Sequence, residues 1–149
     1  MIDRTASEVR TLTVIGAGTM GHGIAHVAAI AGIEVRLFDA ASGAAATGIT
    51  KIGKNLDKGV ELGKLAPIDR EAALGRLRPF DDLAAACTGA DGLIEAIPEK
   101  LELKREVFAA VDRAAPAHAL FATNTSSLPV GEIAASVREP ARLVGMHFF

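Results

Sequence analysis

The amino-acid sequence predicts an α/β domain, in which a mostly parallel sheet carries helices on both faces. Two observations support this fold class. Apolar, strand-like runs alternate with helical patterns along the chain, and short turns connect them. The 149 residues suit one domain, and half of them are hydrophobic, which is ample for a core. We expect the folded domain to span residues 11–149, after an N-terminal tail of residues 1–10.

A glycine-rich loop at residues 16–21 follows the first apolar run, at residues 11–15, and opens a helical stretch. In the pattern G-x-G-x-x-G, the first glycine allows a tight turn and the second lets a dinucleotide pyrophosphate approach the backbone. The third lets the helix pack closely on the strand. Backbone N–H groups and the helix dipole then face the phosphates. We therefore expect a Rossmann-type fold, with the pyrophosphate bound by Gly16, Gly18, Thr19, Met20 and Gly21.

An acidic residue, Asp39, ends the second strand-like run at residues 33–38, near the interval of about 20 residues that dinucleotide-binding domains show. Its carboxylate can accept hydrogen bonds from the adenosine ribose hydroxyls and would repel a 2′-phosphate. Because no Arg or Lys follows until Lys51, we expect no cation near Asp39 and predict NAD rather than NADP. Turn glycines in another kind of α/β unit are the alternative interpretation.

The region of about residues 44–75 is polar and helical, with a break at Ala66-Pro67, and predicts a helix-turn-helix excursion from the sheet. Lys51, Lys54 and Lys58 have the spacing i, i+3, i+7, which places three ammonium groups on one helix face. Two interpretations stay open. The lysines form a solvated surface, or they bind the phosphates of a substrate tail, because ammonium groups are effective partners for phosphate.

Three further apolar runs, at residues 91–97, 118–123 and 142–146, predict strands, and a helix is expected over about residues 99–114. Ligands of open α/β sheets lie outside the carboxyl ends of the strands. The polar residues that the sequence places at this edge are Asp39, Glu95, Asn124, Ser126 and His147.

Three separated motifs carry a resemblance to a known family. Residues 92–100 read Gly-Leu-Ile-Glu-Ala-Ile-Pro-Glu-Lys, residues 124–128 read Asn-Thr-Ser-Ser-Leu, and residues 145–149 read Gly-Met-His-Phe-Phe. With the glycine loop ahead of them, they resemble the 3-hydroxyacyl-CoA dehydrogenase family, most closely its bacterial 3-hydroxybutyryl-CoA type. The resemblance spans residues 11–149. It implies an NAD-binding domain and the reversible oxidation of an L-3-hydroxyacyl-CoA to the 3-oxoacyl-CoA, with hydride delivered to NAD⁺.

The resemblance also implies roles for single residues. Glu95 and Lys100 match positions that contact NAD, and we assign Asn124 to the same cofactor site. Ser126 matches a position that touches both the nicotinamide end and the substrate, and His147 matches the catalytic histidine. An imidazole suits the removal of a hydroxyl proton near neutral pH, and a serine hydroxyl can help to stabilise an alkoxide. The alternatives are a strand-end cap for Ser126, a surface acid for Glu95 and no role for His147.

The family pattern continues beyond His147 to an Asn-Pro pair, a glutamate that orients the histidine, and a helical domain, whereas this sequence stops at Phe149. We therefore expect that the C-terminal helical domain is absent and that this chain is the cofactor-binding portion, incomplete for catalysis. Where that domain is present, the resemblance implies an acyl-CoA substrate and a homodimer. The alternative function is a non-catalytic module that binds NAD or a partner.

Composition excludes several other classes. A net charge of −2 and the absence of Trp and Tyr give no reason to expect nucleic acid as a partner. No uncharged apolar run reaches the ~18 residues of a membrane helix. Residues 1–10 contain two acids and resemble no signal peptide, and the single Cys87 excludes an internal disulfide framework, so we expect a cytoplasmic protein with Cys87 buried. His22 and His26 lack a third ligand, so we expect no metal.

Overall fold

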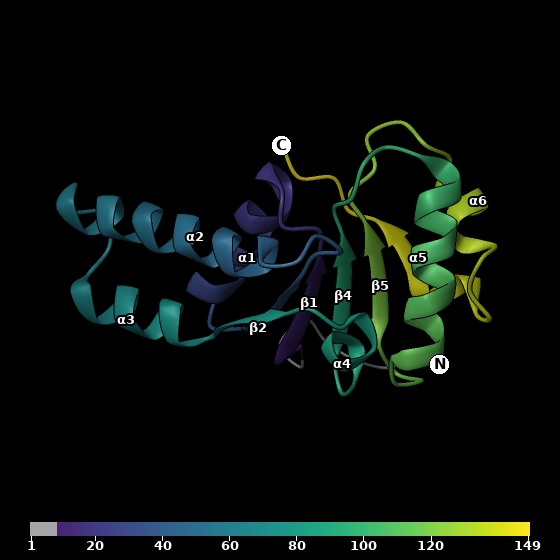
Figure 1. The fold of residues 1–149 in the computed structure, drawn as a ribbon, viewed down its shortest axis with the longest axis horizontal. Helices are drawn as coiled ribbons and strands as arrows, with labels where there is room; N and C mark the ends of the chain where they lie inside the picture. The colour runs from purple at the N-terminus through teal and green to yellow at the C-terminus, as the bar shows by residue number, and fades with distance from the viewer. Residues whose placement is uncertain (1–8) are drawn as a thin grey trace.

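A computed structural model describes residues 9–149, so the tail predicted for residues 1–10 lies outside the described residues except for Val9 and Arg10. Its centre is a six-stranded sheet in the order β3-β2-β1-β4-β5-β6, with every pair parallel (Figure 1). The strands are β1 (Thr11–Ile15), β2 (Glu34–Phe38), β3 (Leu77–Phe80), β4 (Gly92–Glu95), β5 (Leu120–Thr123) and β6 (Leu143–Gly145). The predicted α/β, Rossmann-type fold is confirmed.

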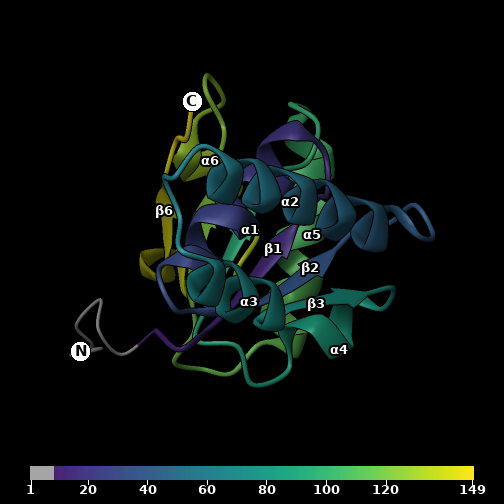
Figure 2. The same ribbon diagram turned by 90° about the vertical axis from the view of Figure 1, so that its left-hand side faces the viewer.

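Helices cover both faces of this sheet in two groups. They are α1 (Thr19–Ile30), α2 (Ala44–Glu61), α3 (Pro67–Gly75), α4 (Leu83–Cys87), α5 (Leu101–Ala114) and α6 (Val130–Ala134), and a short 3₁₀ turn (Pro140–Arg142) precedes β6. One apolar core joins α1, α2 and α3 to the sheet, and a second core joins α4, α5 and α6 to the other face. Figure 2 looks onto the first layer, with α2 and α3 in front of the strands.

The predicted helix-turn-helix excursion is confirmed as α2 and α3, which lie side by side and project beyond the sheet (Figure 1). Ile52 and Leu56 bury one face of α2 against the core. Pro67 begins α3, a position that favours proline because the first helical residue needs no N–H donor. Arg70 Nε of α3 lies 2.9 Å from Asp57 Oδ1 of α2 and ties the two helices together at the surface.

The strand β3, which pairs with β2 at the edge of the sheet, was not predicted from the sequence. Of its four residues Leu77 alone is buried, and Arg78 and Pro79 are exposed. A proline is tolerated on an edge strand because one side of the strand donates no ladder hydrogen bond. A strand of this kind lacks the apolar run by which the other strands were predicted.

The register of the sheet aligns the carboxyl ends of its central strands. Ile15 at the end of β1 pairs with Phe38 of β2 and with Glu95 of β4, and Glu95 pairs with Thr123 of β5. The connections that follow these strands therefore start at one edge, where the sequence places its candidate functional residues.

Candidate cofactor and active site

The glycine loop connects β1 to α1 in a conformation that a larger residue would disrupt. Gly16 has a φ of +102°, and a Cβ there would lie 2.5 Å from the carbonyl oxygen of Ala96. A Cβ on Gly21 would lie 1.6 Å from the carbonyl oxygen of Gly16. Gly18, in contrast, is exposed and has open space where its Cβ would be. The loop is closed toward the protein and open toward solvent at Gly18, which is the shape that an approaching pyrophosphate requires.

The start of α1 supplies donors to the same open side. The first backbone hydrogen bond of the helix runs from His22 N to Gly18 O at 3.0 Å. The backbone N–H groups of the first turn precede this bond and have no carbonyl partner within the helix. Together with the positive end of the helix dipole they form a site for an anion. The residues present therefore fit a dinucleotide.

Asp39 follows β2 and holds the glycine loop in place. Its Oδ2 accepts a hydrogen bond from Ala17 N at 2.7 Å, and its Oδ1 accepts one from Ala41 N at 2.9 Å. A carboxylate oxygen has two acceptor positions, so each can take a further hydrogen bond from a ribose hydroxyl. A cavity of about 410 Å³ lies here, lined by Ala17, Gly18, Asp39, Ser42, Gly43, Ala44, Thr47, Gly48 and Lys51.

Lys51 lines this cavity together with Asp39, although the two are far apart in the sequence. The helix α2 brings it there by packing closely on β2, since a Cβ on Gly48 would come within 2.9 Å of Leu37 Cδ2. Our expectation of no cation near Asp39 is therefore wrong. Lys54 and Lys58 are exposed on the same helix, as the spacing predicted.

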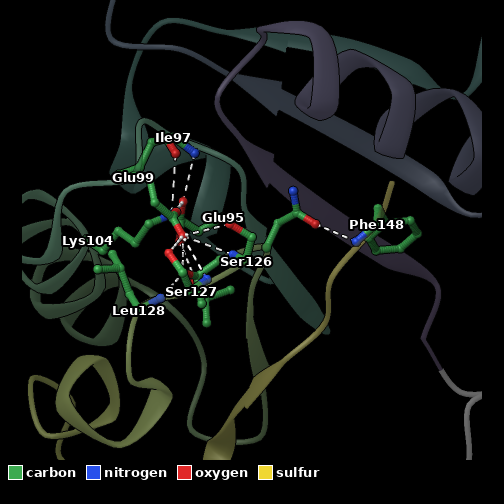
Figure 3. Close-up of polar contacts among 11 residues, drawn as sticks. Glu95, Ile97, Glu99, Lys104, Ser126, Ser127, Leu128 and Phe148 are labelled. Atoms are coloured by element: carbon green, nitrogen blue, oxygen red, sulfur yellow. Dashed lines mark hydrogen bonds and ion pairs between the residues drawn. The ribbon is translucent and has the colours of Figure 1, made fainter.

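A second cavity, of about 340 Å³, lies at the carboxyl ends of β4, β5 and β6. It brings together three residues that the sequence placed at this edge, namely Asn124, Ser126 and His147, with Met20 of the glycine loop. Asn124 Oδ1 accepts a hydrogen bond from Phe148 N at 2.6 Å, which fixes the segment that carries His147 (Figure 3). Ser126 and His147 are exposed to this cavity, and a ligand can reach both.

Comparison with known proteins identifies the domain. Residues 11–149 match the family described as "3-hydroxyacyl-CoA dehydrogenase, NAD binding domain". The chain belongs to this family. It is 43% identical over 141 residues to the 3-hydroxyadipyl-CoA dehydrogenase of Escherichia coli, covering 95% of this chain and 30% of that protein. It is 39% identical over 142 residues to the 3-hydroxybutyryl-CoA dehydrogenase of Mycobacterium tuberculosis, covering 95% of this chain and 49% of that protein.

Solved structures agree with this assignment. The crystal structure of (S)-3-hydroxybutyryl-CoA dehydrogenase from Ralstonia eutropha superposes with a TM-score of 0.90 at 32% identity, covering 95% of this chain and 50% of that one. The chain thus spans about half the length of several relatives it matches. The predicted family and NAD as its cofactor are confirmed.

Within this NAD-binding domain, a buried ion pair joins α5 to the carboxyl end of β4. The side chains of Glu95 and Lys104 are 0% and 1% exposed, and Lys104 Nζ lies 2.6 Å from Glu95 Oε1. Glu95 Oε1 also accepts from Ile97 N at 2.7 Å, and Oε2 accepts from Thr123 Oγ1 at 2.7 Å. The interpretation of Glu95 as a surface acid is therefore wrong. Its contact with NAD stays a prediction, although both of its oxygens bind donors of the protein.

Lys104 was not predicted from the sequence, in which Lys100 was assigned to the cofactor site. Lys100 is exposed just before α5 and is not among the lining residues of either cavity. A signal for Lys104 was present, because it lies on the stripe that α5 buries, three residues after Leu101 and four before Phe108. A lysine within an apolar stripe indicates a buried ionic partner.

Glu99 is a second acidic residue, one to which the sequence motif assigned no role, and it lines the cavity of Ser126 and His147. Burial acts to raise the pKa of its carboxyl. Hydrogen bonds from Thr125, from the backbone of Ser126 and Ser127 and from Lys104 outweigh burial and lower the pKa to about 2. Glu99 is thus a fixed negative charge beside the cavity at neutral pH.

The remaining predictions concern single residues away from the two cavities. Cys87 is fully buried, as expected, and burial raises the pKa of its thiol to about 11. His22 Nδ1 lies 2.6 Å from Gly18 O. The pKa of His26 is lowered, mainly by burial and further by the charge of the nearby His22. Within residues 9–149 no cluster of three or more His, Cys, Asp or Glu side chains is suited to a metal ion. No helix in this part of the chain is long and apolar enough to cross a membrane.

Proposed function

We propose that this domain supplies the NAD-binding half of an enzyme that oxidises an L-3-hydroxyacyl-CoA to the 3-oxoacyl-CoA. The observation that carries the proposal is the second cavity. It holds an imidazole from His147 and a hydroxyl from Ser126 beside Met20, which belongs to the loop that would hold the dinucleotide. The names of the E. coli and M. tuberculosis relatives support the substrate class, since both act on 3-hydroxyacyl-CoA compounds.

The proposed reaction removes a proton and a hydride from one secondary alcohol. Bound NAD⁺ supplies the hydride acceptor. His147 takes the hydroxyl proton as the C–H bond breaks, and the C–O bond becomes a carbonyl. Ser126 donates a hydrogen bond to the oxygen as negative charge develops there. Asn124 takes no part in the transfer of the proton or the hydride. Its Oδ1 accepts a hydrogen bond from Phe148 N and so fixes the position of the neighbouring His147.

The remaining assigned residues bind rather than react. We propose that Gly16, Gly18, Thr19, Met20 and Gly21 hold the pyrophosphate and that Asp39 binds the adenosine ribose. Lys51, Lys54 and Lys58 are exposed on one helix and are proposed to contact the phosphates of CoA. Neutralising all three would then raise the KM for the CoA thioester at least several-fold, and an unchanged KM would exclude this role.

A domain exchange tests the proposed reaction. The matching region of the M. tuberculosis relative is replaced by residues 11–149 of this chain, and NADH formation from L-3-hydroxybutyryl-CoA is followed by absorbance. We expect turnover, and a loss of about 10²-fold or more in kcat for His147→Asn, because a general base contributes that much. His118→Asn is the matched control and should change kcat less than two-fold. A chimera that binds NADH without turnover would favour the non-catalytic module.

We also propose that the longer protein is a cytoplasmic homodimer, as the resemblance to the family implies. A single buried cysteine suits a reducing compartment. Light scattering on the chimera would give a mass of two chains, and a monomer mass at micromolar concentration would contradict the proposal.

A further inference from the structure

Glu99 reaches from the connection between β4 and α5 to the turn that follows β5 (Figure 3). Its Oε1 accepts hydrogen bonds from Ser126 N at 2.9 Å, from Ser127 N at 3.2 Å and from the hydroxyl of Thr125. Two consecutive amide N–H groups of the turn are thus bound by one carboxylate from a neighbouring connection. We infer that Glu99 is the positioning residue for Ser126, an inference that rests on the role of Ser126 in the proposed function.

These contacts fix the backbone of the turn and hold the hydroxyls of Ser126 and Ser127 only at long distance. Ser126 Oγ lies 3.4 Å from Glu99 Oε1, and Ser127 Oγ lies 3.5 Å from it, at the outer limit of a hydrogen bond. A carboxylate oxygen has about two acceptor positions, and the three shorter donors already exceed that number. The exposed hydroxyl of Ser126 can therefore turn away from Glu99 and donate to a ligand in the cavity.

Lys104 fixes the other oxygen of Glu99 and so sets the direction of the carboxylate. Its Nζ lies 3.2 Å from Glu99 Oε2 and 2.6 Å from Glu95 Oε1. Because Glu95 and Lys104 are both buried, the ammonium cannot move away, and Oε1 of Glu99 faces the turn. Thr125 Oγ1 continues the network by accepting from Leu128 N at 3.0 Å.

The arrangement requires acceptors on both sides of the Glu99 side chain. Donors face Oε1 from the turn, and the ammonium of Lys104 faces Oε2. A glutamine has nearly the same shape, but its NH₂ group would meet a donor on one side or the other. Glu99→Gln therefore either removes the acceptor from the turn or leaves a neutral one in place of the carboxylate, with almost no change in volume.

Amide hydrogen exchange, measured by NMR on the 149-residue protein, tests the inference directly. In Glu99→Gln we expect the amides of Ser126 and Ser127 to exchange about 10-fold faster or more, since a hydrogen bond to a charged acceptor is lost. The amide of Ala122 in β5 should change less than two-fold. Glu102→Gln, at an exposed glutamate in the first turn of α5, is the matched control and should change none of them. Unchanged exchange at Ser126, or equal acceleration at Ala122, would overturn the inference.

A double-mutant cycle on NADH affinity separates positioning from a merely structural role. We expect Ser126→Ala to weaken NADH binding about 5-fold in the wild-type background, the value of about one hydrogen bond. In the Glu99→Gln background the same change should cost less than two-fold, because Ser126 is already displaced. Additive effects would overturn the inference. If Ser126→Ala leaves NADH affinity unchanged in the wild type, the contact of Ser126 with the nicotinamide end fails, and amide exchange alone decides whether Glu99 holds the turn.

Discussion

Replacing Lys104 by methionine should destabilise the domain strongly, because it leaves two carboxylates without their shared cation. The ammonium of Lys104 lies 2.6 Å from Glu95 and 3.2 Å from Glu99. Methionine keeps most of the aliphatic volume on the buried face of α5, so the change removes a charge and leaves no large cavity. Glu95 is 0% exposed and cannot be reached by water in its native position.

The size of the effect follows from that burial. Removing one partner of a buried ion pair costs about 3–5 kcal/mol. Glu95 keeps its hydrogen bonds from Ile97 N and Thr123 Oγ1, both at 2.7 Å, which favours the lower end of that range. In a domain of this length each kcal/mol lowers Tm by about 2–4 °C, so a cost of about 3–4 kcal/mol should lower Tm by roughly 6–16 °C.

Urea unfolding at pH 7, followed by circular dichroism, measures this cost. Lys51→Met, at an exposed lysine on α2, is the control and should change the free energy of unfolding by less than about 0.5 kcal/mol. The double variant Glu95→Gln with Lys104→Met should regain more than half of the loss, because no unpaired charge stays buried at Glu95. A Lys104→Met protein within about 1 kcal/mol of wild type would refute the reasoning.

Three further predictions follow from the geometry. Gly21→Ala should abolish NADH binding in a titration, because its Cβ would overlap Gly16 O, whereas Gly23→Ala in the same helix has open space and should bind normally. The Glu99 carboxylate, with a pKa of about 2 against about 4.3 in an unfolded chain, stabilises the fold fully above pH 4.3. That contribution is lost as the pH falls through the folded-state pKa of about 2. The free energies of unfolding of wild type and Glu99→Gln, measured during an acid titration, should therefore converge, and a constant difference between them would contradict this prediction. Cys87 should react with a thiol reagent only on unfolding, and fast reaction of the native protein would show that it is accessible.

The fold was predictable from the sequence where the backbone conformation demands a particular residue type. Gly16 and Gly21 are required by a positive φ and by close backbone contacts, and such requirements leave a mark in the sequence. The strand end at Asp39 was found from the apolar run before it and from its distance along the chain from the glycine loop. In contrast, β3 contains Arg78 and Pro79, and its place beside β2 comes from tertiary pairing rather than from a local pattern.

The location of the site was predictable because the carboxyl ends of parallel strands lie at the same edge of the sheet. Asn124, Ser126 and His147 line one cavity because β5 and β6 are neighbours in the sheet. The place of Lys51 beside Asp39 and the buried ion pair of Lys104 could not be found in this way, because each side chain reaches its surroundings from a helix whose direction the sequence does not define. Lys104 did leave a trace, as a cation on the apolar stripe of α5.

The most direct test of the central claim is a titration of the purified 149-residue protein with NADH, followed by nucleotide fluorescence. The chain has no Trp, so the nucleotide signal can be read against a low protein background. We predict saturable binding of one NADH per chain, with weaker binding of NADPH because of Asp39, and loss of binding in Gly21→Ala but not in Gly23→Ala. No saturable binding up to millimolar NADH, or equal binding by Gly21→Ala, would contradict the assignment of the glycine loop as the cofactor site.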